Sequence, residues 1–449
     1  MKTSLVICFA VALLLAAAPF ARSASPDTPV RLRVELDRSV LPADSPERAI
    51  VKVALEGARL ARPEARPPVN LALVIDRSGS MGGAKIAQAR AAALEAVSRL
   101  GSDDIVALVA FDDRVETLYP AQPLGDGRAL AAAIAELRPG GTTALFAGVE
   151  QGAAEVRKHS EDRRYVSRIV LISDGDANVG PRSPNELGGL GAALMEEGIS
   201  VTTIGLGLDY NEDLMTRLAQ RSDGNTYFAE GAADLPRIFA AELGDVLDVV
   251  ARRVTVTVQF PAGVRPVRLV GREGVVRGQT AEITLNQLYG GQEKFALVEA
   301  EIEPAPAGVE REIASATATF DDAGTQRRLT LTMRAGARFS GSHDLVVASA
   351  NLRVQSDYAA NAIAVAKEQA IALADAGRRA DAASVLRREA QRLEAMGRIY
   401  SNGSVLSISA SNTAEADRLG RDGLDNATRK DYRTDGANTY SQQATLRQP

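Results

Sequence analysis

Short apolar runs alternate with segments of helical periodicity throughout residues 69–250, and this alternation restricts the possible fold more than any other feature of the chain. The runs are continuously apolar, as in VNLALVID at 69–76 and RIVLIS at 168–173. Strands that are apolar on both faces belong to a sheet covered by helices on both sides, and strands separated by helices pair in parallel. We therefore predict an α/β domain with a doubly wound parallel sheet of the Rossmann-like type, in which ligands bind beyond the carboxyl ends of the strands. Its helices are expected near 84–100, 126–137, 145–158, 185–197, 211–222 and 232–248.

The segments on either side alternate between apolar and polar residues, a pattern typical of half-buried strands. It is found in RVTVTVQF at 253–260 and, before the α/β domain, in VRLRVEL at 30–36. The N-terminal strands alone would make only a marginal hairpin. Because the ends of a domain often lie close together, we predict that these strands join the later ones. The α/β domain would then be inserted in, or followed by, an all-β sandwich.

Residues 357–398 carry apolar positions at helical spacing on both sides of Gly377, which predicts a C-terminal helical hairpin followed by a polar tail. The hairpin resembles one tetratricopeptide unit, and a lone unit is more often a packing element than a peptide receptor. The predicted organisation is a signal peptide at 1–23, N-terminal strands at 24–68 that join the β domain, the α/β domain at 69–250, a β-sandwich at 251–356, and the hairpin with its polar tail at 357–449.

The N-terminus has the features of a secretory signal peptide: Lys2, an apolar stretch from Leu5 to Ala18, and a small residue at Ser23, after which cleavage is expected. Cleavage would remove Cys8, the only cysteine, so the mature chain would have no disulfide and no thiolate metal site. High Ala and Arg content suggests a bacterial source. We expect a secreted or periplasmic protein, with an uncleaved segment kept as a membrane anchor as the alternative.

Several classes of protein are excluded by composition. His159 and His343 are the only histidines, which leaves no cysteine–histidine catalytic pair and argues against a zinc centre. The formal net charge is −5, with no basic patch, so nucleic acid is not expected as a partner. No second apolar run approaches the roughly 20 residues that cross a bilayer, so no stable membrane span is expected after signal cleavage.

Oxygen-bearing side chains occupy alternate positions where the first strand of the α/β domain ends, at Asp76, Ser78 and Ser80. Side chains alternate sides along extended backbone, so these three point the same way. Two more oxygen-bearing residues follow elements whose ends should meet at the same edge of the sheet. Thr142 lies on a loop before a helix, and Asp174 lies at the carboxyl end of another strand. The alternative is that Asp76 and the serines only cap the next helix, which would explain neither Thr142 nor Asp174.

In order and context, these five residues resemble the metal-ion-dependent adhesion site of the von Willebrand factor type A (VWA) domain. The resemblance covers roughly residues 69–250, with Thr143 as the alternative to Thr142. The flanking regions look like those of secreted bacterial proteins loosely called calcium-activated chloride channel homologues, a label that does not imply channel activity. In the family, the two serines and usually the threonine coordinate the ion directly, and the aspartates act largely through water.

The resemblance implies a divalent cation as cofactor, because carboxylate, hydroxyl and water oxygens suit Mg²⁺, Ca²⁺ or Mn²⁺, with Mg²⁺ expected first. Neutral hydroxyls leave much of the charge of the ion uncompensated. The family therefore suggests that an Asp or Glu carboxylate of a protein partner completes the coordination. The leading hypothesis is an exported, non-enzymatic adhesion or scaffold protein.

Two other functions remain as alternatives. One is an envelope assembly or quality-control factor that binds clients through the β and helical regions. The other is a metal-dependent hydrolase in which the ion activates water, although no motif supplies a spare acid–base residue.

Two further polar clusters have simpler interpretations. Asp112 and Asp113 lie at a strand end near the predicted site and favour a solvated loop. Asp209, Asn211, Glu212 and Asp213 predict the capped, acidic start of a helix, with calcium binding as the alternative.

Overall fold

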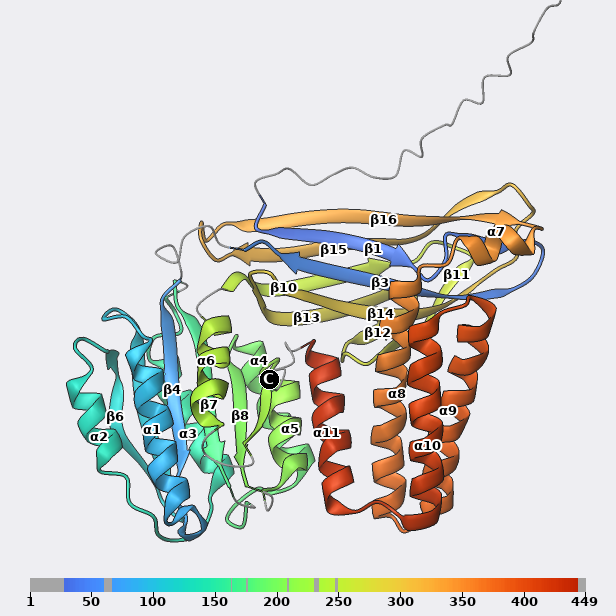
Figure 1. Cartoon of the computed structure of the whole chain (residues 1–449). Helices are drawn as coiled ribbons and strands as arrows, with labels where there is room; N and C mark the ends of the chain where they lie inside the picture. The colour runs from blue at the N-terminus through green and yellow to red at the C-terminus, as the bar shows by residue number, and fades with distance from the viewer. Residues whose placement is uncertain are drawn as a thin grey trace, which may run out of the picture.

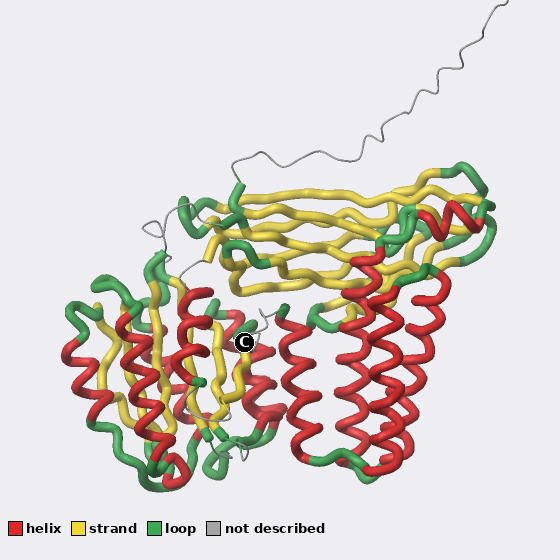
Figure 2. Tube along the Cα trace, in the orientation of Figure 1, coloured by secondary structure: helices red, strands yellow, loops and turns green. Residues whose placement is uncertain are grey.

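The computed structural model describes residues 28–59, 67–162, 164–174, 177–207, 210–229, 234–246 and 249–442. The predicted signal peptide at 1–23 therefore lies outside the described residues. The chain forms an α/β domain, a β-sandwich across one end of that domain, and a group of helices beside it (Figure 1). The strands of the sandwich extend over both the α/β domain and the helices (Figure 2).

The α/β domain contains a six-stranded sheet in the order β6-β5-β4-β7-β8-β9. Its strands are β4 (Val69–Asp76), β5 (Ile105–Phe111), β6 (Val115–Pro123), β7 (Val166–Ser173), β8 (Ser200–Leu206) and β9 (Thr226–Ala229). Five of them are parallel, which confirms the predicted doubly wound α/β fold. The edge strand β6 runs antiparallel to β5, which we did not predict. The connection at 112–114 is too short for a crossover and permits only an antiparallel hairpin.

Helices cover both faces of this sheet because the side chains of its strands alternate between them. Leu71, Leu73 and Ile75 of β4 share one core with α1 (Ala84–Ser98), α2 (Arg128–Ala135) and α6 (Leu235–Val246). Ala72 and Val74 point to the other face and share a core with α3 (Leu145–Arg157), α4 (Pro184–Glu196) and α5 (Glu212–Arg221). The central strand β4 is therefore fully buried, and its carboxyl end is held rigidly from both sides.

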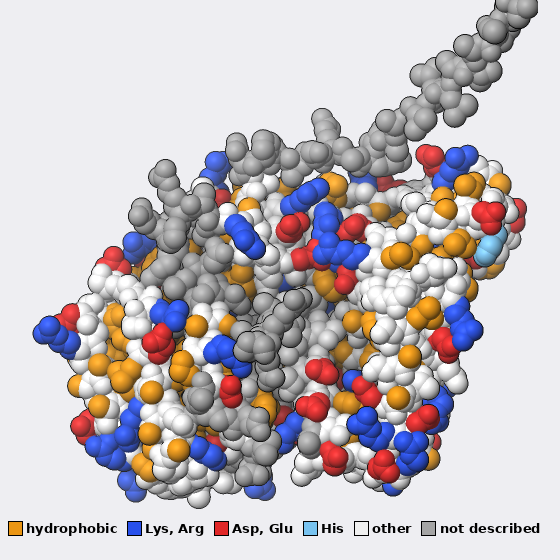
Figure 3. All heavy atoms as spheres, in the orientation of Figure 1, with side chains coloured by type: hydrophobic (Ala, Val, Ile, Leu, Met, Phe, Trp, Pro, Cys, Tyr) orange, Lys and Arg blue, Asp and Glu red, His pale blue; other side chains and the backbone are white. Residues whose placement is uncertain are grey.

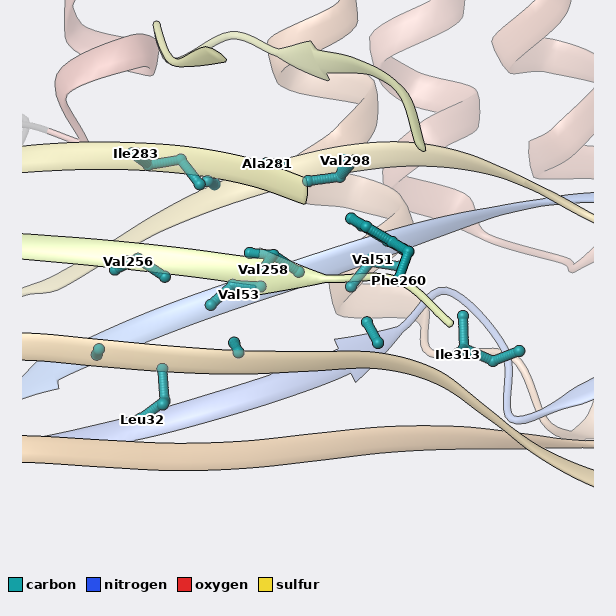
Figure 4. Close-up of a cluster of buried hydrophobic side chains, with 14 of the residues drawn as sticks. Leu32, Val51, Val53, Val256, Val258, Phe260, Ala281, Ile283, Val298 and Ile313 are labelled. Carbon is teal, nitrogen blue, oxygen red and sulfur yellow. The ribbon is translucent and has the colours of Figure 1, made fainter. Parts of the chain in front are cut away.

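The two sheets of the β-sandwich combine strands from before and after the α/β domain. One sheet has the order β1 (Val30–Leu36), β3 (Glu47–Gly57), β14 (Glu293–Ile302), β11 (Val264–Val270). The other has the order β12 (Val275–Arg277), β13 (Thr280–Tyr289), β10 (Val249–Gln259), β15 (Glu310–Asp322), β16 (Arg328–Ser340), β2 (Val40–Pro42). Val51 of β3 pairs with Val298 of β14, and both lie in the apolar core between the sheets (Figure 4). The N-terminal strands thus join the later ones, and the α/β domain is inserted between them.

The C-terminal helices are more numerous than predicted. They are α7 (His343–Ala348), α8 (Leu352–Asp375), α9 (Arg379–Ile399), α10 (Gly403–Asp422) and α11 (Asn426–Ser441). Helices α8 and α9 form the predicted hairpin about Gly377. Residues 403–441, which we predicted as part of a polar tail, form α10 and α11 instead. Each of these two helices begins after an N-capping residue. Asn402 accepts a hydrogen bond from the Val405 amide, and Asp425 accepts one from the Thr428 amide.

Among the residues that the structure describes, no helix is both long and apolar enough to cross a bilayer. On the face shown in Figure 3, basic and acidic side chains are interspersed, so no large basic patch forms there.

Buried polar side chains join the amino end of the α/β sheet to the sandwich. Arg168 on β7 pairs with Glu242 on α6, and both side chains have no exposed surface. The same guanidinium donates to Gln287 at 3.0 Å and to the Tyr289 hydroxyl, both on β13 of the sandwich. Burial alone would lower the pKa of Arg168, but Glu242 and Tyr289 raise it above its ordinary value. The amino end of the sheet is thus covered, and the carboxyl end lies away from the sandwich (Figure 1).

A second buried ion cluster holds the far end of α5 against the sandwich. The Asp223 carboxylate accepts hydrogen bonds from Arg272 and Lys294, each at 3.1 Å, and from the Asn286 amide at 2.8 Å. Burial would raise the pKa of Asp223, but Lys294 and Arg272 outweigh it and lower that pKa below its ordinary value. The α/β domain and the sandwich therefore share two buried polar junctions.

Helix α11 connects the C-terminal helices to the α/β domain through basic side chains. Lys430 donates to Glu212 and to the Tyr210 carbonyl, each at 2.8 Å, and Arg433 pairs with Asp213 at 2.6 Å. Arg429 pairs with both of these acidic residues. The acidic start of α5 is therefore confirmed, and its carboxylates are already neutralised by protein cations instead of standing free for calcium.

Replacing Arg429 and Arg433 together by Ala should loosen α11 from the α/β domain. Partly exposed ion pairs of this kind together contribute about 1–2 kcal/mol, so amide exchange within 426–441 should accelerate about tenfold. Hydrogen exchange monitored by mass spectrometry measures this change. The matched control is Arg398→Ala, which removes only a pair with Glu394 inside α9. Unchanged exchange in α11 would show that the basic residues do not hold the helix.

Candidate metal centre

The candidate site lies at the carboxyl ends of the two central strands. Strand β4 ends at Asp76, and the neighbouring strand β7 ends at Ser173, directly before Asp174. The two strands are paired in parallel, with Ile75 opposite Ile172, so the two aspartates emerge side by side. After β4 the chain turns through a short 3-10 helix at Gly79–Met81 before α1 begins. The doubly wound topology thus brings together residues that are far apart in sequence.

Four of the five predicted residues form one hydrogen-bonded cluster. The Ser78 amide donates to Asp76 Oδ1 at 2.7 Å, and Ser173 Oγ donates to Asp76 Oδ2 at 2.5 Å. The hydroxyls of Ser78 and Ser80 lie 3.0 Å apart, and Ser80 Oγ donates to Asp174 Oδ1 at 2.8 Å. The predicted convergence of Asp76, Ser78 and Ser80 toward Asp174 is therefore what the structure has. Ser173 was not predicted, although its place directly before Asp174 is a signal that could have identified it.

Thr142 lies on the neighbouring loop, which backbone hydrogen bonds attach to the cluster. The Gly79 amide donates to the Gly141 carbonyl at 3.1 Å, and the Gly140 amide donates to the Arg77 carbonyl at 2.8 Å. Thr142 is exposed beside this attachment, whereas Thr143 is buried and its amide donates to Asn178 Oδ1. Thr142 is thus next to the cluster through the backbone, and exposure favours it over Thr143 as a ligand.

Asp112 and Asp113 support this loop. The Asp112 carboxylate accepts from Arg77 Nε at 2.9 Å and from the Arg114 amide at 2.7 Å. Gly141 has φ +71, and a Cβ there would lie 2.0 Å from Asp113 Oδ1, so only glycine fits. These contacts agree with the interpretation of Asp112 and Asp113 as part of a loop.

The Asp76 carboxyl lies in a place that solvent water does not reach. Its side chain is completely buried, and burial raises the pKa of the Asp76 carboxyl above its ordinary value. The Asp174 charge adds to this rise, while hydrogen bonds from Ser173 and Ser78 oppose it. An additional positive charge beside Asp76 would therefore be favourable.

Lys85 supplies one positive charge to the cluster, and we did not predict it. It lies in the first turn of α1, and its ammonium group forms an ion pair with Asp174 Oδ2. The sequence feature that could have identified Lys85 is its position in the helix that starts directly after the glycine-rich turn.

The donor set fits a hard divalent cation. Two carboxylates and the hydroxyls of Ser78 and Ser80 lie together, and oxygen donors of this kind suit Mg²⁺, Ca²⁺ or Mn²⁺. Thr142 follows Gly141, whose carbonyl accepts the Gly79 amide. Among the described residues there is no group of three or more His, Cys, Asp or Glu side chains that could hold a metal ion. Any site here would thus depend on its hydroxyls. Asp76, Ser78, Ser80, Thr142 and Asp174 would hold the ion, which would supply a positive charge at the surface.

Comparison with known proteins identifies the α/β domain. The sequence model of the von Willebrand factor type A domain family matches residues 70–241. The uncharacterized protein sll0103 of Synechocystis is 31% identical over 243 residues, which are 52% of this chain and 57% of that protein. The chain thus spans little more than half the length of this relative.

Solved structures extend the similarity in fold to most of the chain. The von Willebrand factor type A protein from Catenulispora acidiphila has a TM-score of 0.66 at 17% identity, covering 88% of this chain and 90% of its own. The ArnB paralog VWA2 from Sulfolobus acidocaldarius has a TM-score of 0.60 at 18% identity, covering 92% and 98%. At these identities the likeness shows the fold alone. Residues 70–241 thus match the VWA family, and the α/β domain that they form has the fold of a VWA domain.

Proposed function

We propose that this protein binds a protein partner through a divalent cation held by Asp76, Ser78, Ser80, Thr142 and Asp174. Mg²⁺ is the expected ion, with Ca²⁺ or Mn²⁺ as alternatives. An Asp or Glu carboxylate of the partner completes the coordination. We further propose that the protein is exported, acts in adhesion or as a scaffold, and is not an enzyme.

The observation that carries this proposal is the cluster at the carboxyl end of the sheet. Ser78 and Ser80 place two hydroxyls 3.0 Å apart, next to the buried charge of Asp76. Ser80 is exposed, so a ligand can approach the cluster from solvent. A divalent ion here would balance the charge of the Asp76 carboxylate on its protein side and would attract a carboxylate that approaches from solvent.

The proposed ligands also explain why a binding function is favoured over hydrolysis. Asp76 accepts bonds from Ser78 and Ser173, and Asp174 accepts from Ser80 and pairs with Lys85. Both carboxylates are thus engaged in holding the site, which leaves neither available as the base that a hydrolase needs.

Replacing Ser80 by Ala should weaken Mg²⁺ binding by at least about tenfold, because one neutral oxygen ligand is lost. Ser80 is exposed, so folding should be unaffected. Isothermal titration of Mg²⁺, Ca²⁺ and Mn²⁺ into the full chain measures the change and ranks the ions.

The control is Asp126→Ala, which removes an exposed carboxylate that pairs with Arg128 at the other end of the domain. That variant should bind the ions as the wild type does. Equal affinities for the wild type and Ser80→Ala would contradict the proposed ligand set, and no binding by the wild type would overturn the proposed function.

A further inference from the structure

Among the residues that the structure describes, Lys85 is the one basic residue that forms an ion pair with a carboxylate of the cluster. Its ammonium group pairs with Asp174, whose side chain has no exposed surface, while the side chain of Lys85 is 36% exposed. Gly207, which follows β8, lies against the lysine: a Cβ on this glycine would be 3.6 Å from Lys85 Cε. The lysine is therefore held between the site and the end of a neighbouring strand, with one side open to solvent.

The second basic residue nearby is already neutralised elsewhere. Arg77 lies between Asp76 and Ser78 in sequence, but its guanidinium pairs with Asp112 at 2.9 Å and with Glu116 at 3.0 Å. Its charge is therefore balanced by two carboxylates outside the cluster. The ionisable groups of the cluster are thus the carboxyls of Asp76 and Asp174 and the ammonium group of Lys85, which pairs with Asp174.

This charge balance has a consequence for a bound divalent cation. Counted over the whole cluster, two carboxylates would bring the formal net charge of the loaded site to zero, and a carboxylate from a partner would then make it negative. With Lys85 present, the loaded site keeps one net positive charge, which one external carboxylate neutralises. Like charges at short separation repel even in water, so the lysine also weakens binding of the ion alone.

We propose that Lys85 couples cation binding to carboxylate binding. It lowers the affinity of the site for the cation alone, and it raises the affinity of the cation-loaded site for an external monocarboxylate. The proposal rests on the proposed function of the same site. Lys85 acts through Asp174 and through its charge, and it is a tuning residue, not a ligand. The coupling is reciprocal, because a carboxylate that strengthens cation binding must itself bind more tightly when the cation is present.

The test compares Lys85→Met with Lys85→Arg in the full chain by isothermal titration of Mg²⁺. Each titration is run in sodium acetate, as the monocarboxylate probe, and in sodium chloride of the same ionic strength. In chloride, Lys85→Met should bind Mg²⁺ about tenfold more tightly than the wild type. Acetate should strengthen Mg²⁺ binding by the wild type and by Lys85→Arg, and should leave Lys85→Met nearly unchanged. Thermal unfolding checks that each variant is folded, and Lys85→Gln replaces the Met variant if that one is not.

The outcomes separate this proposal from the one on which it rests. If the wild type binds Mg²⁺ but the neutral variant binds it equally or more weakly, the coupling role of Lys85 is wrong and the cation site stands. If acetate strengthens Mg²⁺ binding equally in the wild type and the neutral variant, the coupling is also overturned. If the folded wild type binds no Mg²⁺ in either salt, both proposals fail.

Discussion

Replacing Asp76 by Asn should abolish divalent cation binding while leaving the protein as stable as the wild type, or more stable, in the presence of a chelator. Loss of a charged group that holds an ion weakens binding by at least about 100-fold. Titration of Mg²⁺ and thermal unfolding in chelator measure the two effects on the same samples.

The surroundings of Asp76 explain why the substitution should abolish cation binding without lowering stability. An asparagine can keep both hydrogen bonds, accepting from the Ser78 amide and donating to Ser173 Oγ. It also removes a buried charge whose ionisation is costly, as the raised pKa of Asp76 indicates.

The pH dependence in chelator has a definite sign. A carboxyl whose native pKa is raised binds its proton more tightly in the folded state. Such a carboxyl therefore lowers the stability of the folded protein as the pH rises. The loss begins above about 3.9, the pKa of the carboxyl in the unfolded chain, and is complete above its raised pKa in the folded protein. The Asn variant should lack this loss. A variant that still binds Mg²⁺ with wild-type affinity, or that unfolds in chelator, would contradict the account of Asp76.

Replacing Arg168 by Met should destabilise the protein by about 3–5 kcal/mol, because it leaves the Glu242 carboxylate buried without its partner. Glu242 would retain bonds from Thr202 Oγ1 at 2.6 Å and Asn225 Nδ2 at 2.9 Å, but no cation. The same change removes the donor to Gln287 and Tyr289 of the sandwich. We therefore expect the α/β domain and the sandwich to separate more easily.

Urea unfolding of the full chain measures this effect, with Arg168→Met, Glu242→Leu and the double variant in one cycle. The double variant should be more stable than Arg168→Met, because it leaves no buried charge unpaired. The control is Arg128→Met, which removes a side chain that is 90% exposed and should change stability by less than about 0.5 kcal/mol. A double variant less stable than either single one would show that the pair is not the source of the effect.

Local sequence rules were sufficient for the strand ends that build the candidate site. The alternation of Asp76, Ser78 and Ser80 follows from backbone geometry, and Asp174 follows from the rule that parallel strands end at one edge. The cluster in the structure has these four residues in contact. The predicted fold of the α/β domain and the joining of the N-terminal strands to the sandwich rest on equally simple periodicities.

The features that were missed depend on contacts between distant parts of the chain. Arg168 looks like the polar start of a strand in RIVLIS, yet its partner Glu242 is 74 residues away and Tyr289 is 121 residues away in another domain. Helix α11 has few apolar residues, and its position depends on ion pairs with α5 that no periodicity reveals. Lys85 likewise acquires its role only because the topology brings Asp174 to it.

The most direct test of the account is to locate a bound ion in crystals of the full chain grown with Mn²⁺, using its anomalous scattering. We predict one strong peak at the carboxyl end of β4, about 2.0–2.6 Å from the hydroxyl oxygens of Ser78 and Ser80, that is absent from crystals of Asp76→Asn. A peak elsewhere on the protein, or none at this cluster in well-ordered crystals of the wild type, would contradict the central claim that these side chains hold a divalent cation.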